Sequence, residues 1–247
     1  FFRWTAKARI GVIPGIIIIS AAPLIASAVI GGRYKDSMNQ SGESLDVLIV
    51  QPNIDPYNKF QAMTQDQQNA LLEGQLTSSL KDRKADSSAV SPLLVVAPET
   101  FTSDIVCGDY PRSRTWRRFT SFLSDYPGVN MLFGASSYDY IYQDERPSYT
   151  ARNLRDGLWV ESHNSALMID GTARTDIFHK SKLVVATELT PFPKIVVPLE
   201  NWLSKMMGVS GLVGRCVGQD EVSNLTFGDE LPLGCAVCYE SVYGEYC

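Results

Sequence analysis

Apolar and polar residues follow one another along this chain in short blocks with two different periods. Residues 60–84 place Leu72, Leu76 and Leu80 at helical spacing, and residues 115–126 form a second amphipathic pattern. The second pattern puts Trp116, Phe119, Phe122 and Leu123 on one face. Short apolar or alternating runs bounded by Pro, Gly, Asn or Asp predict strands at 46–51, 92–98, 130–136, 164–170, 174–180 and 231–238. Asp170-Gly171 predicts a hairpin turn, and the whole pattern predicts an α/β fold with a mixed sheet.

An uncharged segment precedes this pattern. Residues 10–32, IGVIPGIIIISAAPLIASAVIGG, carry no charged side chain, and a helix of that length can cross a hydrocarbon core of about 30 Å. The basic residues in 1–9 have no acidic neighbour, so the positive-inside tendency predicts a cytoplasmic N-terminal stub. Polar residues 33–45 predict a linker, and the catalytic domain is expected over 46–247, outside the cytoplasm.

The composition argues against a nucleic-acid partner and against a disulfide-rich scaffold. The chain has 247 residues and a formal net charge of −5, so no basic excess is available to neutralise the phosphates of a nucleic acid. Five cysteines are too few for a disulfide scaffold at this length, and their odd number predicts at least one free thiol. The first residue is Phe1 and the last is Cys247, which follows Cys238 closely; we expect both ends to be internal to a longer chain.

Reactive side chains gather at the ends of predicted strands, in the stretches 97–101, 178–183, 186–192 and 236–241. Together these stretches supply carboxylates, lysines and a cysteine. A carboxylate can deprotonate a thiol, and a lysine ammonium can stabilise both the thiolate and the oxyanion of a tetrahedral intermediate. These groups supply a base, a nucleophile and an electrophile for acyl transfer, a reaction that then requires neither a metal nor an organic cofactor. The alternative is that these Glu and Lys side chains are solvated residues at the rim of the sheet.

The order of these motifs matches a known family. Pro98-Glu99-Thr100, Phe178-His179-Lys180 with Leu183, and Cys238-Tyr239-Glu240 resemble the Glu-Lys-Cys signature of the nitrilase superfamily. VQPNID at 50–55, the glutamate in VATELTPF, and the membrane helix ahead of the domain are similar to its membrane branch, the apolipoprotein N-acyltransferases. The resemblance implies a nitrilase-like α-β-β-α sandwich that is incomplete at its C-terminus and preceded by a transmembrane helix.

The resemblance also implies residue roles. Glu99 matches the general base, Lys180 the lysine that stabilises the oxyanion, and Cys238 the nucleophile. Supporting positions are Glu188, Tyr239 and Glu240, although Glu240 could simply brace the site through hydrogen bonds. Lys182 is the alternative to Lys180, and the register Phe-x-Lys-x-x-Leu favours Lys180.

Two regions depart from the family pattern or extend it. The loop tryptophan of the family is absent, and Tyr57 or Phe60 is expected to form the aromatic lid instead. Residues 191–214 are more apolar than a loop requires. They predict either ordinary packing on the domain or a membrane-facing arm in which Trp202 and Met206 contact acyl chains.

By resemblance, the chain is expected to transfer an acyl group from a phospholipid to the N-terminal amine of a diacylglyceryl-cysteine apolipoprotein, through a thioester. This activity would belong to a multi-pass protein of the bacterial inner membrane, with its catalytic domain on the periplasmic side. Two alternatives stay open: a nitrilase-type amidase acting on a small carbon–nitrogen substrate, and a redox or metal-binding module built on Cys235 and Cys238. A Cys-His dyad is disfavoured because His179, next to Lys180 in a strand, should point to the opposite face.

Overall fold

The computed structural model describes residues 6–41, 44–55, 59, 62–85, 91–208 and 214–244. The chain divides into two units, one ending at Ser44 and the other beginning at Leu45. Helix α1, Ala6–Ser41, makes up the first unit, and its segment Pro14–Ser37 is long and apolar enough to cross a membrane. This finding rests on length and composition, as the sequence argument did.

Helix α1 is longer than the apolar pattern predicted. Pro14 and Pro23 both lie inside it, and the helix continues through residues 33–41, which the sequence assigned to a linker. Residues 33–41 are therefore helical, and the linker stays a prediction. Once a helix is nucleated, each further residue adds a hydrogen bond at little cost, so a polar extension without Pro or Gly can stay helical.

The second unit is built on a mixed seven-stranded sheet with the order β1-β2-β4-β6-β5, in which β3 also pairs with β4 and β7 with β6. Its strands are β1 Asp46–Ile49, β2 Leu93–Val96, β3 Thr102–Val106, β4 Val129–Tyr142, β5 Arg152–Arg155, β6 Leu158–Asp170 and β7 Thr175–His179. The turn at Asp170-Gly171 joins β6 to β7 as predicted. Strands β4 and β6 are much longer than their apolar runs, and β3 and β5 were not predicted. All of the added segments are rich in polar residues, so hydrophobic pattern alone did not mark them.

Strands β4 and β6 form the centre of the sheet. The outer edge of each pairs with two shorter strands, one after the other. Along β4, the parallel strand β2 pairs with its first part and β3 with its second, with a break between them opposite Gly134. Along β6, β7 pairs with residues 165–169 and β5 with residues 158–160. The break beside β4 and the gap beside β6 lie at nearly the same level, because Gly134 pairs with Ala166 and Ser136 with Asn164.

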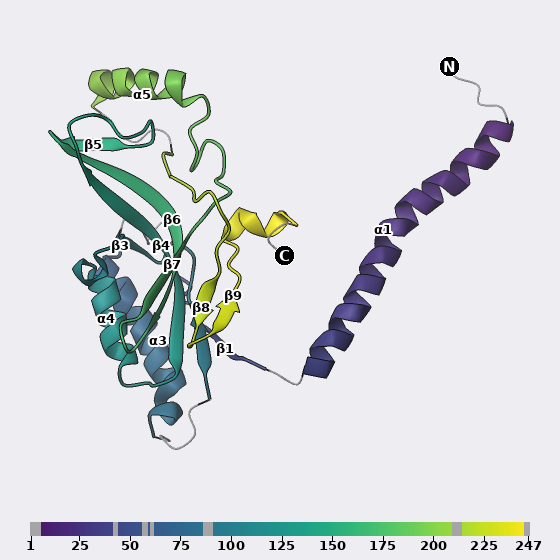
Figure 1. Ribbon diagram of the computed structural model, residues 1–247, viewed down its shortest axis with the longest axis horizontal. Coiled ribbons are helices and arrows are strands. Elements are labelled where there is room, and N and C mark those ends of the chain that lie inside the picture. Colours follow the sequence, from purple (N-terminus) through teal and green to yellow (C-terminus); the bar gives the residue numbers. More distant parts are fainter. Residues whose placement is uncertain are drawn as a thin grey trace. The chain divides into compact units, whose positions relative to one another are not determined.

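One face of this sheet is covered by helices α3, Gln65–Ala85, and α4, Arg114–Leu123, as Figure 1 shows. A short 3₁₀ turn, η1, Tyr110–Arg112, precedes α4. The main core lies between the helices and the sheet and confirms the predicted helix faces. Its helical members include Leu72, Leu76, Leu80, Trp116, Phe119 and Leu123, with Phe122 packed at its edge.

The other face of the sheet carries a short hairpin, β8 Leu225–Phe227 with β9 Leu231–Leu233 (Figure 1). A second apolar cluster joins the hairpin to Leu94, Met168 and Phe178 of the sheet. The strand predicted over 231–238 therefore ends at Leu233, and a 3₁₀ turn, η2, begins at Cys238. The observed class is mixed α/β, with one layer of helices and a two-stranded second sheet among the described residues.

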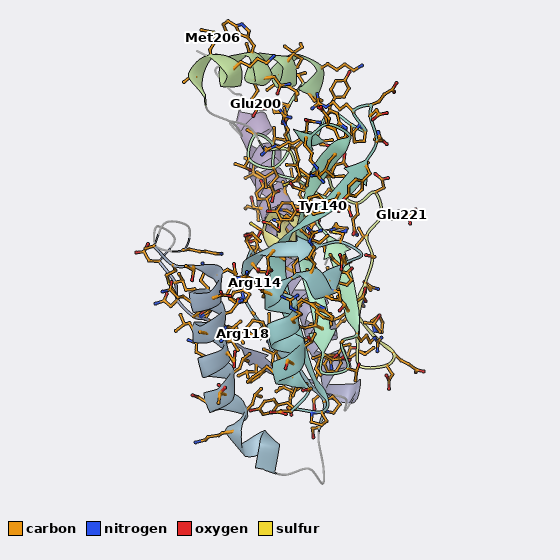
Figure 2. All side chains as sticks on the ribbon, turned by 90° about the vertical axis from the view of Figure 1, so that its left-hand side faces the viewer. Arg114, Arg118, Tyr140, Glu200, Met206 and Glu221 are labelled. Atoms are coloured by element: carbon orange, nitrogen blue, oxygen red, sulfur yellow. The ribbon has the colours of Figure 1, made fainter. Side chains whose placement is uncertain are left out.

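The apolar segment after residue 190 contains a helix, α5, Pro193–Met207, which lies beyond β5 at one end of the unit (Figure 1). Val197 and Glu200 are buried, whereas Ile195, Trp202 and Met206 are more than half exposed. In Figure 2, Met206 lies on the outer side of this helix and Glu200 on the side that faces the sheet. Ordinary packing thus accounts for one face of the helix and leaves an exposed apolar stripe on the other.

Candidate active site

Glu99 lies in the break between β2 and β3. Thr100 has a φ of 50°, a left-handed conformation that turns the chain away from its strand direction. The break packs directly on Gly134 of β4, where a Cβ atom would lie 2.6 Å from the Glu99 Cα. Phe101 donates its N–H to the Gly134 carbonyl at 2.7 Å, and Gly134 donates to the Pro98 carbonyl at 3.0 Å. Glycine at 134 is therefore what lets the Glu99 turn lie against the sheet.

Lys180 follows β7 and is almost completely buried, with 1% of its surface exposed. Its backbone N–H donates to the Asn164 carbonyl, which positions it in the gap beside β6. Its Nζ lies 3.0 Å from Glu188 Oε1 and 2.9 Å from Oε2, so the buried ammonium is paired. Lys182, the alternative candidate, is exposed, and its Nζ lies 6.0 Å from the centre of the Tyr243 ring.

Glu188 is held by three donors. Its Oε2 accepts the Val184 N–H at 2.8 Å, and its Oε1 accepts from the side chains of Lys180 and Asn164. Burial by itself raises the pKa of Glu188, but the hydrogen bonds from Val184 and Asn164 and the Lys180 ammonium outweigh it, so the pKa lies below its ordinary value. Glu188 is therefore a carboxylate at neutral pH.

Asn164 joins the two glutamates and was not predicted from the sequence. Its Nδ2 donates to Glu99 Oε1 at 3.0 Å and to Glu188 Oε1 at 2.8 Å. One amide thus connects Glu99, Glu188 and, through Glu188, Lys180 in a single network. The available signal was its place in the strand NSALMID, where its side chain alternates with that of His163 and so points to the other face.

Cys238 begins the η2 turn and has a φ of 53°, which is unusual for a residue other than glycine. Its side chain is exposed, and its carbonyl accepts a hydrogen bond from Ser241 Oγ at 2.8 Å. A strained turn that presents an exposed side chain is also the geometry of nucleophile elbows in hydrolases.

The turn at Cys238 is tied to the residues that follow Lys180 by Glu240, which is fully buried. Glu240 Oε1 accepts the N–H groups of Ser181 at 2.7 Å and Lys182 at 3.1 Å, and its Oε2 accepts the Val237 N–H at 2.9 Å. This capture of Val237 draws the backbone into the turn, which gives a physical reason for the strand to end before Cys238. Glu240 therefore fastens the turn at Cys238 to the loop after Lys180.

Cys235 and Cys238 are both free thiols. Cys235 packs against the second apolar cluster, and burial, helped by the nearby Glu240 carboxylate, raises its pKa to about 11. The alternation of side chains along a strand does not separate the two cysteines, because residues 234–237 form no strand. Their separation comes instead from the packing of Cys235 and the turn at Cys238. Among the described residues, no group of three His, Cys, Asp or Glu side chains could hold a metal ion.

The predicted lid residues Tyr57 and Phe60 lie outside the described residues, but Lys59 between them is described. Lys59 Nζ donates to the Thr100 carbonyl at 2.6 Å, next to Glu99. Burial lowers the pKa of Lys59, and the Glu99 carboxylate acts in the opposite direction. Tyr239 is exposed and packs edge-on against Tyr243, with ring centres 6.0 Å apart.

The site residues come from different parts of the fold. The structure brings Glu99, Lys180 and Glu188 into one hydrogen-bonded network and attaches the Cys238 turn to the loop after Lys180 through Glu240. Trp202 and Met206 lie on α5, with exposed side chains. The arrangement combines an accessible carboxylate, a buried and paired ammonium, and an exposed thiol on a strained turn, which are groups used in covalent acyl chemistry.

Comparison with known proteins gives one distant likeness. No protein-family model matches the chain. The chain is similar to the apolipoprotein N-acyltransferase of Chlorobaculum tepidum, at 22% identity over 96% of this chain. It spans 42% of the length of that relative. This likeness agrees with the resemblance that the Glu99, Lys180 and Cys238 motifs indicated.

Proposed function

We propose that this chain carries the catalytic centre of an N-acyltransferase that modifies lipoproteins, with Glu99 as general base, Lys180 as oxyanion-stabilising cation and Cys238 as nucleophile. The name of the distant relative supports this reading. The observation that carries the proposal is the network Glu99–Asn164–Glu188–Lys180, tied through Glu240 to the strained turn at Cys238.

The proposed reaction has two halves. In the first, Glu99 takes the thiol proton of Cys238, and the sulfur attacks an ester carbonyl of a phospholipid. The oxyanion is stabilised by Lys180, and its collapse breaks the ester bond; the leaving lysophospholipid oxygen receives the proton from Glu99. The product of this half is an acyl thioester on Cys238.

In the second half, the α-amine of a diacylglyceryl-cysteine attacks the thioester carbonyl. Glu99 accepts a proton from that amine, the carbon–sulfur bond breaks, and the proton returns to the thiol. An amide is formed and the enzyme is regenerated, so the kinetics should be ping-pong. A lysine and a thiol supply the electrophile and the nucleophile, so the proposed steps need no metal or organic cofactor.

The remaining site residues take supporting roles in this proposal. Glu188 holds Lys180, Glu240 braces the Cys238 turn, and Tyr239 lines the site beside the nucleophile. Tyr57 or Phe60 would provide the aromatic lid. Trp202 and Met206 on α5 would contact the bilayer and the acyl chains, in line with their exposure.

We further propose that the domain is a nitrilase-like sandwich, whose second sheet is represented here by β8 and β9. Helix α1 would anchor it as one span of a multi-pass protein in a bacterial inner membrane, with the catalytic domain on the periplasmic side. A membrane position is supported by the length and apolar composition of Pro14–Ser37.

Mass spectrometry tests the covalent step. The full-length protein in detergent, incubated with phospholipid, should gain one acyl group on the peptide that contains Cys238. Cys238→Ala should abolish the adduct, because no other residue is assigned as the nucleophile. Cys235→Ala is the matched control and should retain the adduct, because Cys235 is packed in the apolar cluster.

An acyl adduct that persists in Cys238→Ala would refute the nucleophile. Equal damage by Cys235→Ala and Cys238→Ala would instead support a dithiol or metal site. If the adduct forms on Cys238 but passes to water rather than to a lipopeptide amine, the amidase alternative would replace the transferase.

A further inference from the structure

Residues 214–218 form a strap that closes the gap along β6 between β5 and β7. Cys216 forms a parallel bridge with Ser162, and the Val217 N–H donates to the Ser162 carbonyl at 2.8 Å. The Cys216 N–H donates to the Glu188 carbonyl at 2.7 Å. Because Glu188 pairs with the buried Lys180, the strap fixes the main chain of a residue at the centre of the candidate site.

The strap is closely fitted at both of its glycines. A Cβ atom on Gly214 would lie 1.8 Å from the Thr187 carbonyl oxygen, and one on Gly218 would lie 3.0 Å from the carbonyl oxygens of Lys180 and Ser181. Arg215 of the same strap pairs with the buried Glu200 of α5. Movement of the strap would therefore disturb the segments that carry Lys180 and Glu188.

On the other face of β6, His163 holds the strap. Its ring is 7% exposed, its Nδ1 lies 2.9 Å from the Val217 carbonyl oxygen, and its Nε2 lies 2.9 Å from Asp139 Oδ2. A carbonyl oxygen can only accept a hydrogen bond, and so can an ionised carboxylate. A neutral imidazole has one N–H and would leave one of these contacts without a proton. Only the imidazolium form donates to both.

We propose that His163 is a positioning residue for the reaction at Cys238: as an imidazolium shared between Asp139 and the Val217 carbonyl, it locks the strap that fixes Glu188 and, through it, Lys180. This inference rests on the proposed function for its effect on catalysis. Its structural part, a charged histidine that holds the strap, stands independently.

His163 forms a stacked pair with His179, and the surroundings of this pair fit a charge on His163 alone. The ring of His179 on β7 lies over that of His163, with centres 4.3 Å apart, and His179 Nδ1 contacts Ser165 Oγ at 2.7 Å. Burial and the neighbouring His163 lower the pKa of His179 to about 4, so His179 is neutral at pH 7. The second ring therefore adds no like charge next to His163.

Other titratable groups lie on the segments that adjoin this cluster. After β3, the Cys107 thiol faces Ser137 and Asp139, and burial raises its pKa. From the strap, the Cys216 thiol also has a pKa raised by burial. On β6 itself, Glu161 accepts from Ser148 and Thr150. Asp139 is thus the carboxylate that hydrogen-bonds His163, and its removal should neutralise the histidine.

Nitrogen-15 NMR of labelled histidine tests the charge directly, because this chain has two histidines and a variant of each assigns the signals. In the full-length protein in detergent at neutral pH, His163 should carry protons on both ring nitrogens and His179 on one. Asp139→Asn should convert His163 to a neutral tautomer. A neutral His163 in the unaltered protein would overturn the proposal.

Hydrogen exchange and thioester formation test the consequence. In His163→Gln, the amides of Cys216 and Val217 should exchange at least tenfold faster, and the rate of thioester formation should fall about tenfold to a hundredfold with little change in KM. Thr120→Ala is the matched control: it removes a buried hydroxyl that donates to the Trp116 and Arg117 carbonyls within α4, away from the histidine pair and the strap, and both readouts should stay within twofold.

A double variant separates positioning from simple loss of stability. Asp139→Asn should accelerate strap exchange and slow thioester formation as His163→Gln does, and the two substitutions together should add nothing further, because both remove the same link to the strap. Additive effects, or strap exchange that is unchanged in Asp139→Asn, would refute the proposal. Absence of any thioester in the unaltered protein would refute the proposed function instead, and the NMR and exchange results would still decide the role of His163.

Discussion

Hydrogen-bond donors hold the acidic side chains of this site in place. Glu99 and Glu188 would repel one another as carboxylates, and the Asn164 amide that donates to both offsets this repulsion. Glu240 is a different case, because its buried carboxylate accepts backbone N–H groups from two separate segments and so fastens them together. Each of these side chains acts by holding another group in place.

Replacement of Asn164 should therefore impair catalysis more than folding. In Asn164→Leu, the two carboxylates lose their shared donor, and Glu99 should move away from its present position. We expect thioester formation on Cys238 to fall about a hundredfold, the scale of a misplacement of about 1 Å. Asn153→Leu on β5, an exposed asparagine whose side-chain amide donates to the Arg155 carbonyl of the same strand, is the matched control and should stay near the unaltered rate. A rate within twofold for Asn164→Leu would contradict this role.

The lowered pKa of Glu188 predicts a pH dependence of stability. The group has a lower pKa in the folded chain than its ordinary value of 4.5, so the unfolded chain binds its proton first as pH falls. The stabilisation is therefore fully present above about pH 4.5 and is lost as pH falls through the folded pKa. Urea unfolding measured between pH 7 and pH 3 should show this loss, and Glu188→Gln should reduce it. The exposed Glu221 provides a control in Glu221→Gln, whose pH dependence should match that of the unaltered protein.

At the scale of secondary-structure elements, the site lies at two interruptions in the pairing of the sheet, one along β4 and one along β6. The edge of β4 is shared by β2 and β3, and the turn between them carries Glu99. The edge of β6 is shared by β7 and β5, and Lys180 lies at the gap between them. Because β4 and β6 pair along their whole length, these interruptions come to the same level of the sheet.

Gly134 is the element-level feature that can be tested most directly. A methyl group in Gly134→Ala would meet the backbone of Glu99 and Thr100 at 2.6 Å, and main-chain atoms there cannot rotate away. We expect a destabilisation of about 1–3 kcal/mol and a loss of thioester formation of about a hundredfold. Gly74→Ala on α3 meets nothing within 4 Å and should instead stabilise the protein by about 0.5–1 kcal/mol. Thermal unfolding and the rate of Cys238 acylation, measured for both variants, test these expectations. Unaltered activity in Gly134→Ala would contradict the close contact between Gly134 and the Glu99 backbone.

At the scale of the whole molecule, helix α5 presents an exposed apolar surface. Helix α5 is fixed by Val197 and by the buried pair of Glu200 with Arg215, yet Trp202 and Met206 are exposed on it. Burying such side chains in an interface is favourable by roughly 1.5–3 kcal/mol each. A helix anchored on one face and apolar on the other is suited to lie on a lipid surface.

A double variant tests this surface. Trp202→Ser with Met206→Ser should reduce acyl transfer from phospholipid vesicles by about tenfold or more, because two apolar contacts are lost, and should leave transfer from a short-chain, detergent-dispersed donor nearly unchanged. Val222→Ser, at a similarly exposed apolar residue outside α5, is the control and should not affect either donor. Equal loss with both donors would show that α5 serves folding or the site itself rather than the bilayer.

Hydrophobic period and motif order made part of this architecture predictable. The apolar faces of α3 and α4 were predictable because buried side chains recur there at a helical interval. The strands β1, β2, β4, β6 and β7 were predictable because each contains a short apolar run. The outer halves of β4 and β6, together with β3 and β5, were not predicted, because polar residues interrupt their apolar positions and their pairing comes from a neighbouring strand. Helix α1 extends beyond its predicted end, and β9 stops before its predicted end. In both cases local hydrogen bonds, rather than hydrophobicity, set where the element stops.

The sequence by itself determined the α/β class, the apolar N-terminal helix and the Glu99, Lys180 and Cys238 motifs, because these depend on residue type and local spacing. The tertiary structure alone decided that Asn164 joins two glutamates, that Glu240 braces the Cys238 turn, and that His163 meets the strap. Each of these contacts joins residues far apart in the chain. Their register is set by the pairing of β4 with β6 and by close backbone packing at Gly134, Gly214 and Gly218, which no local pattern records.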